Sequence, residues 1–125
     1  KGKLKNKKIC FLGVTFKANT DDMRDSSSLS MIPALVKKGA KINYFDPTGE
    51  KDNFKKLKNV SFSNNISVAI KDSDLIVIHT EWNDFKAINF KKKVENKKFI
   101  IFDMRNIYSP AKMQELKIKY FGVGC

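Results

Sequence analysis

The sequence predicts an α/β fold, namely a Rossmann-like, doubly wound and mostly parallel sheet of five to six strands with helices on both faces. The first observation behind this prediction is a set of three apolar runs of strand length, at residues 9–14, 74–79 and 99–103. These runs are continuous rather than alternating, which is typical of strands buried on both faces of a parallel sheet. The second observation is that helical patterns separate the strands, and this alternation favours right-handed, doubly wound topologies.

Six strands and several helices are expected, in an order that alternates along the chain. The strands are expected at residues 9–14, 41–45, 60–63, 74–79, 99–103 and 120–123. The longer helices are expected at residues 26–38, at 65–71 and from Ser109-Pro110 onward, where serine offers an N-cap and proline suits the first helical position. Weaker signals predict a short surface helix at 50–57, a short helix or turn at 85–88 and a surface lysine run at 90–94.

The helix at residues 26–38 has the clearest signals. Its apolar side chains recur at helical spacing, at Leu29, Ile32, Leu35 and Val36. The three serines at 26–28 offer N-caps, and Gly39 provides a stop after a cationic last turn. Pro33 interrupts this pattern, because a proline inside a helix removes a backbone hydrogen bond and costs about 3 kcal/mol. We therefore expect either a loose first turn or a bend at the proline.

The length of 125 residues fits one domain with a sizeable core. Residues 1–6 are basic and are interpreted as the tail of a linker from an upstream domain, which leaves residues 7–125 as the domain itself. No apolar run reaches the roughly 18–20 residues needed to cross a bilayer, and residues 1–8 lack the apolar segment of a signal peptide. We therefore expect a cytoplasmic location and no membrane partner.

The formal net charge is +12, from 25 Lys and Arg residues against 13 Asp and Glu residues. Only Arg24 and Arg105 are arginines, and the lysines are spread along the whole chain. Dedicated nucleic-acid surfaces favour arginine, because its planar fork matches phosphates and bases. The pattern thus favours a solvated surface without a specific nucleic-acid partner, with attraction to phosphate-bearing ligands as a secondary effect. A basic module that binds nucleic acid stays open as an alternative.

The two cysteines and the one histidine indicate neither a disulfide framework nor a metal site. Cys10 lies within the first apolar strand and is expected to be a small buried side chain. Cys125 is the last residue. His79 closes the strand at 74–79, and no cluster of cysteine or histidine lies near it in the sequence. We therefore expect no bound metal.

The chemistry is expected beyond the carboxyl ends of the strands, where ligands bind in open α/β sheets. The first strand leads into a polar loop with Lys17 and Arg24, and the strand at 99–103 leads directly to Arg105. Cationic side chains that converge on one crevice suit a diphosphate. The alternative is that they are capping residues and solvated loop residues.

Two familiar motifs are missing from the loop after the first strand. The dinucleotide fingerprint G-x-G-x-x-G is absent, since Gly13 is the single glycine there. A phospho-receiver domain needs an acidic pair directly at the end of this strand, whereas six residues separate Val14 from Asp21 and Asp22. Because adjacent loop residues seldom point at the same atom, we interpret the two aspartates as structural hydrogen-bonding residues rather than catalytic or Mg²⁺-binding ones.

Four motifs in register resemble the C-terminal domain of the UDP-glucose/GDP-mannose dehydrogenase family. They are F-K-x-N-T-D-D-M-R-x-S-x-S from Phe16, Y-F-D-P from Tyr44, T-E-W from Thr80 and F-D-M-R-N from Phe102. The similarity covers almost the whole chain from Lys7 onward. The T-D-D-M-R and T-E-W forms are more similar to UDP-glucose 6-dehydrogenases than to the UDP-N-acetylmannosamine or GDP-mannose enzymes, which stay open as alternatives.

This resemblance implies a substrate-binding domain within a larger enzyme. Members of the family carry an N-terminal NAD domain, a central dimerisation segment and this C-terminal UDP-sugar-binding domain. The implied partners are therefore UDP-glucose, the upstream NAD-binding and dimerisation domains of the same polypeptide, and a second copy in a homodimer. Such enzymes oxidise the C6 hydroxyl of the sugar to a carboxylate, using two NAD⁺ and a cysteine nucleophile.

The resemblance also assigns roles to four residues of this sequence. Phe16, Lys17 and Arg105 would contact the UDP-sugar, with the Lys17 charge near the phosphates. Arg24 would reach the pyrophosphate of NAD across an interdomain cleft. The nucleophile of the family lies upstream of this domain, so the resemblance implies no catalytic residue here and an isolated domain that is inactive.

Overall fold

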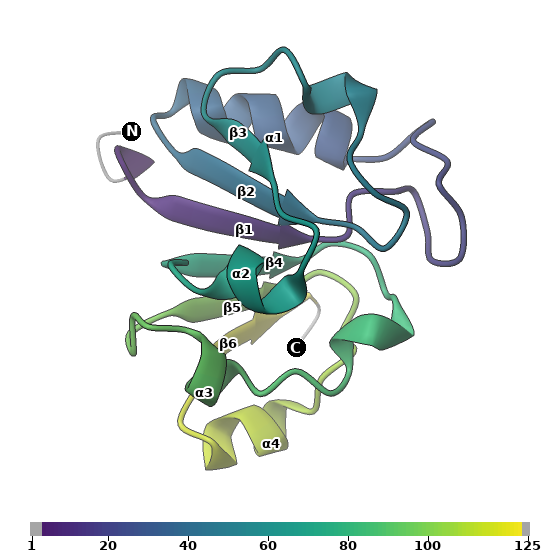
Figure 1. The fold of residues 1–125 in the computed structure, drawn as a ribbon. Coiled ribbons are helices and arrows are strands. Elements are labelled where there is room, and N and C mark those ends of the chain that lie inside the picture. The colour runs from purple at the N-terminus through teal and green to yellow at the C-terminus, as the bar shows by residue number, and fades with distance from the viewer. Residues whose placement is uncertain (1–3, 124–125) are drawn as a thin grey trace.

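A six-stranded sheet forms the centre of the computed structural model, which describes residues 4–123 (Figure 1). Its strands are β1 (Lys8–Leu12), β2 (Lys41–Phe45), β3 (Val60–Phe62), β4 (Leu75–Ile78), β5 (Ile100–Asp103) and β6 (Lys119–Gly122). The helices are α1 (Ser28–Lys37), α2 (Ile66–Ile70), α3 (Phe90–Lys93) and α4 (Pro110–Glu115), with 3-10 turns η2 (Asp52–Phe54) and η3 (Asn83–Phe85). The predicted Rossmann-like fold is confirmed, with all six expected strands in place.

Every pair of neighbouring strands runs parallel, in the order β3-β2-β1-β4-β5-β6. The order reverses between the central strands β1 and β4, which is the switch point of a doubly wound sheet. There Leu12 of β1 pairs with Phe45 of β2 on one side and with Ile78 of β4 on the other. Ile78 in turn pairs with Asp103 of β5. The carboxyl ends of these four strands therefore lie level along one edge, and this edge is called the carboxyl edge below.

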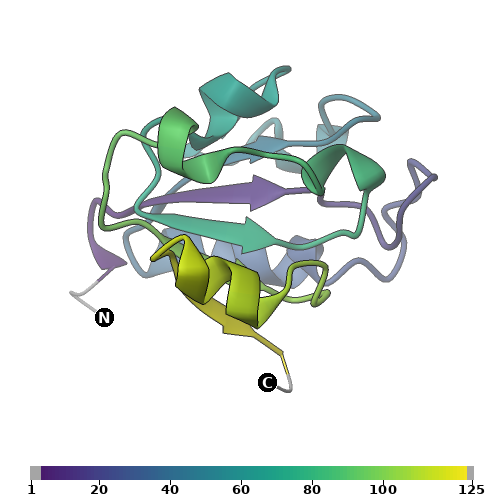
Figure 2. The same cartoon turned by 90° about the horizontal axis from the view of Figure 1, so that it is seen from below.

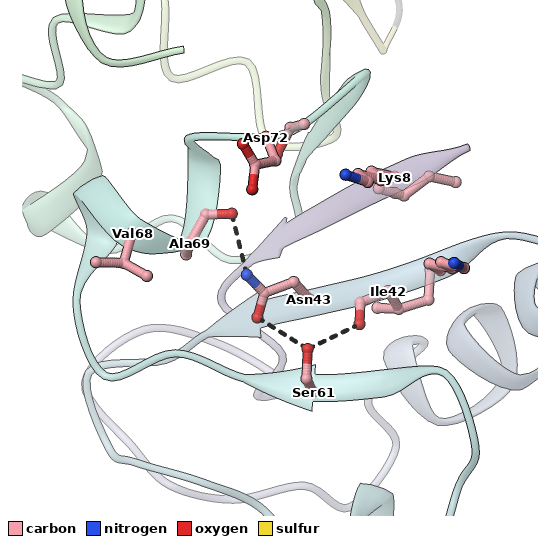
Figure 3. Close-up of a pocket in the computed structure, with 10 residues that line it drawn as sticks. Lys8, Ile42, Asn43, Ser61, Val68, Ala69 and Asp72 are labelled. Atoms are coloured by element: carbon pink, nitrogen blue, oxygen red, sulfur yellow. Dashed lines mark hydrogen bonds between the residues drawn. The ribbon is translucent and has the colours of Figure 1, made fainter. Parts of the chain in front are cut away.

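Each face of the sheet buries its own hydrophobic core. On one face Phe11 of β1 packs in a cluster with Ile32 of α1 and Phe54 of η2. On the other face Leu12 of β1 packs in a cluster that includes residues of α2, η3, α3 and α4. Figure 2 shows α1 on one side of the sheet and α2 and α3 on the other. Because the central strands are covered twice, they need apolar side chains in both directions, which explains their continuous apolar runs.

The caps of the helices follow the sequence signals in part. Asn65 and Ser109 accept hydrogen bonds from the backbone N–H of the third residue of α2 and of α4, as N-caps do. Helix α1 continues through Pro33 as one element and stops before Gly39, which has a φ of +100°. The expected serine N-cap of α1 is confirmed in position only, because Ser27 is the N-cap residue but its side chain makes no capping hydrogen bond.

The segment at residues 50–57 differs from its prediction. Instead of a surface helix it forms only the turn η2, and Phe54 within it is buried. The ring of Phe54 packs edge-on against Tyr44, with centroids 5.3 Å apart. Burial of this one side chain fixes the chain in a single tight turn, and 3-10 geometry is common in such short pieces.

The lysine run at residues 90–94 also differs from its prediction, because it forms helix α3 rather than a plain surface segment. Phe90 and Val94 are both buried, while Lys92 and Lys93 are exposed. Residues four apart lie on the same face of a helix, so this apolar pair anchors the turn to the core. Asn89 caps it by accepting from the N–H of Lys92.

The structure of residues 4–123 bears on the predictions that were made for the cysteines and for metal binding. Cys10 is fully buried, as expected, and this burial raises the pKa of its thiol to about 12. Cys125 lies outside the described residues. Within the described chain no group of three or more His, Cys, Asp or Glu side chains is arranged to hold a metal ion. No helix in this part of the chain is long and apolar enough to cross a membrane.

Gly13, directly after β1, lies where a side chain has no room. Its φ is +80°, and a Cβ at this position would lie 2.5 Å from the Cβ of Thr80. Both the backbone conformation and the close approach of Thr80 therefore require glycine.

We expect Gly13→Ala to lower the free energy of unfolding by about 3 kcal/mol, from the left-handed backbone and from overpacking against Thr80. Gly49→Ala is the matched control, because Gly49 has a φ of +96° but no atom within 4 Å of an added Cβ. We expect this control to lose only about 1 kcal/mol. Urea unfolding measures both values, and equal losses would show that the Thr80 contact adds nothing.

Candidate functional site

The loop that follows β1 is fastened to the carboxyl edge by buried hydrogen bonds. The backbone N–H of Val14 donates to Oδ2 of Asp46, which follows β2, at 2.8 Å. The carbonyl of Val14 accepts from the hydroxyls of Ser26 and Ser28, each at 2.6 Å. The serines that were expected to cap α1 therefore connect the two ends of the loop instead. Their partner, the carbonyl of Val14, lies twelve to fourteen residues earlier in the chain, so the local sequence around the serines gave no sign of this contact.

A second set of bonds passes through His79, which is buried just after β4. Its Nε2 lies 2.9 Å from Oγ of Ser27, and its Nδ1 lies 3.0 Å from Oγ1 of Thr80. The Thr80 hydroxyl donates its proton to the carbonyl of Thr15 at 3.0 Å. It must therefore accept from an Nδ1–H, and Nε2 is left to accept from Ser27. His79 is thus a neutral imidazole with its proton on Nδ1.

Burial, and to a smaller extent the charge of Arg105, lower the pKa of His79 to about 4. Asp46 acts in the opposite direction, since a nearby carboxylate favours the imidazolium. The neutral form therefore predominates at neutral pH. The lone histidine gave no functional signal in the sequence, because Ser27 lies 52 positions away.

Arg105 extends from the end of β5 across the carboxyl edge. Its Nε donates to the carbonyl of His79 at 2.9 Å, and its Nη2 donates to the carbonyl of Phe16 at 3.3 Å. The structure therefore brings Arg105 to the loop that carries Phe16 and Lys17, as the argument from the carboxyl ends of the strands predicts. Among residues 4–123 the guanidinium forms no ion pair, so the carbonyls position its charge without neutralising it.

Asp103, which precedes Arg105 by two residues, fixes the backbone of residues 105–108, which follow β5. Its buried carboxylate accepts from the backbone N–H of Arg105, Ile107 and Tyr108 and from the hydroxyl of Tyr120. Such an arrangement satisfies the charge with donors from the chain itself. The aspartate of the F-D-M-R-N motif thus holds the backbone from which Arg105 extends.

Phe16 and Lys17 present their side chains to solvent at the tip of the edge. The ring of Phe16 is 45% exposed, and Lys17 is exposed as well. Their backbone is held, because the N–H of Phe16 donates to the carbonyl of Asp22 and the Thr15 hydroxyl donates to the carbonyl of Lys17, both at 2.9 Å. The ammonium of Lys17, the ring of Phe16 and the Arg105 guanidinium that is hydrogen-bonded to this loop can together bind an anion attached to a flat ring.

Arg24 lies on the same loop but has a different environment. Its Nε and Nη2 donate to the two carboxylate oxygens of Asp22, each at 3.0 Å, while its side chain is 88% exposed. Hydrogen bonds from Arg24 lower the pKa of Asp22 to about 2. Asp22 therefore has the structural role that was predicted for it. The side chain of Arg24 is therefore held by Asp22 and not by the two carbonyls that bind Arg105.

The T-E-W motif divides between two structural roles. Thr80 is the fully buried link between His79 and the loop. Trp82 is 8% exposed and belongs to the core on the α2 side, with Phe85 of η3 close by in sequence. Its indole N–H is buried without a hydrogen-bond partner among the described residues. Glu81, between them, is exposed.

Comparison with known proteins identifies the family. The UDP binding domain of the UDP-glucose/GDP-mannose dehydrogenase family matches residues 10–110. The chain belongs to this family. The match contains the loop of Phe16 and Lys17, the T-E-W motif and Arg105, so the whole carboxyl edge described above lies within the family's domain.

Curated relatives and solved structures agree with this assignment. UDP-glucose 6-dehydrogenases of Rickettsia felis and Rhizobium meliloti are 38% and 36% identical to the chain over 98% of its length. The UDP-D-ManNAc dehydrogenase of Pyrococcus horikoshii has a TM-score of 0.75 at 25% identity, over 98% of this chain and 26% of that one. A dehydrogenase from Methanosarcina mazei, at 24% identity and a TM-score of 0.83, supports the fold alone. The chain spans 28% of the length of the two curated relatives.

The low pKa of His79 makes stability depend on pH. The unfolded chain protonates His79 near its ordinary value of 6.5, whereas the folded chain resists protonation down to about 4. The stabilisation is therefore complete above pH 6.5 and is lost as the pH falls toward 4, by about 3 kcal/mol in total.

Glutamine cannot titrate in this range. Between pH 7 and about pH 4 we therefore expect the free energy of unfolding of His79→Gln to fall by about 3 kcal/mol less than that of the wild type. Urea unfolding at several pH values measures this difference, and the carboxylates contribute equally to both proteins. Parallel pH profiles for the two proteins would contradict the depressed pKa.

Proposed function

We propose that this chain is the UDP-sugar-binding domain of an NAD-dependent UDP-glucose 6-dehydrogenase, which oxidises UDP-glucose to UDP-glucuronate in two NAD-linked steps. Family membership and the names of the relatives at 36–38% identity support this proposal. The observation that carries the binding role is the position of Arg105, whose guanidinium is held by the carbonyls of His79 and Phe16 and forms no ion pair within residues 4–123.

Three side chains of the edge bind the UDP-sugar in this proposal. Arg105 and Lys17 supply the positive charge for the diphosphate, and Arg105 can bind two oxygens at once through its planar fork. The exposed ring of Phe16 packs against the nucleotide or the sugar. No residue of this chain takes a bond-making role, because the nucleophile of this chemistry belongs to an upstream part of the enzyme.

The cofactor NAD supplies the hydride acceptor when it is bound to the upstream domain. In this chain one residue suits a contact with NAD. The exposed Arg24 can donate hydrogen bonds to the pyrophosphate if it gives up its bonds to Asp22. Arg24 is therefore the cofactor-facing residue of the edge. The upstream NAD-binding and dimerisation domains and a second copy of the polypeptide complete the enzyme.

The identity of the hexose is the finer part of the proposal. A UDP-D-ManNAc dehydrogenase resembles the chain at 25% identity, whereas UDP-glucose 6-dehydrogenases reach 36–38%. The higher identities favour glucose. Because Arg105 and Lys17 are proposed to act on the diphosphate, their contribution is the same for either sugar.

We expect UDP to bind the chain and Arg105→Ala to weaken this binding about tenfold or more, because a charged hydrogen-bond donor to phosphate is worth roughly 1.5–3 kcal/mol. Lys17→Ala should weaken it less, since a flexible ammonium acts as a point charge. Isothermal titration calorimetry with UDP and UDP-glucose measures these affinities.

Lys41→Ala is the matched control, because exposed Lys41 lies at the opposite, amino end of β2. It and Arg24→Ala should leave the UDP affinity within about twofold. An equal loss for Arg105→Ala and Lys41→Ala would mean that only net charge matters. Tight, steeply salt-dependent retention of generic DNA would instead favour the nucleic-acid alternative.

We expect no NADH from this chain with UDP-glucose and NAD⁺, because the proposed roles of its residues are confined to binding. Absorbance at the NADH band measures this directly, with a complete UDP-glucose 6-dehydrogenase as the positive control. Substantial turnover by the chain alone would contradict the assignment of the nucleophile to another domain.

A further inference from the structure

We propose that His79 is a positioning residue for the nucleotide site, because its side chain fixes the two carbonyls that hold the Arg105 guanidinium. This inference rests on the proposed function for the identity of the ligand that Arg105 binds. It concerns a residue that lies inside the protein, behind the exposed side chains of the carboxyl edge.

The argument begins with three hydrogen bonds that run in one direction. Ser27 at the start of α1 donates to Nε2 of His79, Nδ1–H donates to Thr80, and the Thr80 hydroxyl donates to the carbonyl of Thr15. Each hydroxyl or ring in this series donates to the next, and hydrogen bonds linked in this way polarise and strengthen one another. The series, called the His79 relay below, connects α1, the end of β4 and the loop after β1.

Both acceptors of Arg105 lie directly beside the His79 relay. One is the carbonyl of His79 itself, and the other is the carbonyl of Phe16, the residue after Thr15. A ring held at both nitrogens leaves residue 79 little freedom, and a held Thr15 carbonyl limits the rotation of the next peptide. The relay therefore fixes the distance between the two carbonyls, and this distance sets the orientation of the guanidinium plane.

A serine hydroxyl on a histidine nitrogen can also indicate a nucleophile and its base. The geometry here favours a tether instead. The second nitrogen of His79 faces the Thr80 hydroxyl, so within residues 4–123 no carboxylate hydrogen-bonds to the ring as a base of this kind requires, and burial outweighs the favourable charge of Asp46. The depressed pKa agrees, since it makes the ring a weak base. The imidazole is thus suited to hold its neighbours in place.

The first experiment needs no ligand. The chain contains one histidine and two arginines, so ¹⁵N NMR spectra show one imidazole and two Nε–H groups. We expect His79 to carry its proton on Nδ1, and the Arg105 Nε–H to exchange with water more slowly than that of the exposed Arg24. A proton on Nε2 of His79 would overturn the relay.

The relay can be broken without changing the shape of its buried member. Thr80→Val removes the hydroxyl at constant size, Thr80→Ser restores it, and Ser27→Ala breaks the other end near the surface. We expect Thr80→Val and Ser27→Ala to shift the Arg105 Nε–H signal and to speed its exchange about tenfold, with the Arg24 signal unchanged. Thr80→Ser and the control Ser30→Ala, one turn along α1, should match the wild type.

The same variants are then titrated with UDP. We expect Thr80→Val to bind UDP about tenfold more weakly and Thr80→Ser to restore the affinity to within about twofold, measured on folded protein. A weaker fold alone would not move the Arg105 signal selectively. An unchanged Arg105 signal in both Thr80→Val and Ser27→Ala would overturn the proposal. If UDP fails to bind even the wild type, the proposed function fails, while the Arg105 signal still decides the role of His79.

Discussion

The close packing of Thr80 against Gly13 is the contact on which the carboxyl edge depends. Without a Cβ at Gly13, the end of β4 can approach the end of β1 closely enough for the Thr80 hydroxyl to reach the loop. That hydroxyl is also the partner that gives His79 its tautomer. One missing side chain thus allows β1, β4 and α1 to share a single set of hydrogen bonds.

The neighbouring strands use the same physical device at their own ends. Asp46 after β2 and Asp103 at the end of β5 are both buried, and both accept backbone N–H groups of nearby loops. A buried polar group that loses its partner costs roughly 1–3 kcal/mol, so each of these bonds resists opening. The edge is therefore made rigid by hydrogen bonds, and a rigid backbone lowers the entropic cost of binding a ligand.

The sequence allowed the fold and part of the site to be predicted, for reasons that particular residues make clear. The strands could be predicted from the apolar runs. The proximity of Arg105 to the loop of Phe16 could be predicted because the carboxyl ends of neighbouring parallel strands lie at the same edge of the sheet. Helix α3 was missed because its lysines obscured the buried pair Phe90 and Val94. The role of His79 was missed because its partner Ser27 is 52 positions away, and no local pattern marks such a contact.

The two arginines of the edge differ in how their charges are held, and this difference matters for the proposed function. Carbonyls orient Arg105, and no ion pair within residues 4–123 neutralises it, so an arriving anion does not have to displace a carboxylate there. Arg24 is already paired with Asp22, so an anion must compete with a carboxylate there. A strongly anionic diphosphate is therefore expected to bind first at Arg105. Arg24 then suits a ligand whose other contacts, on another domain, offset the loss of the Asp22 bonds.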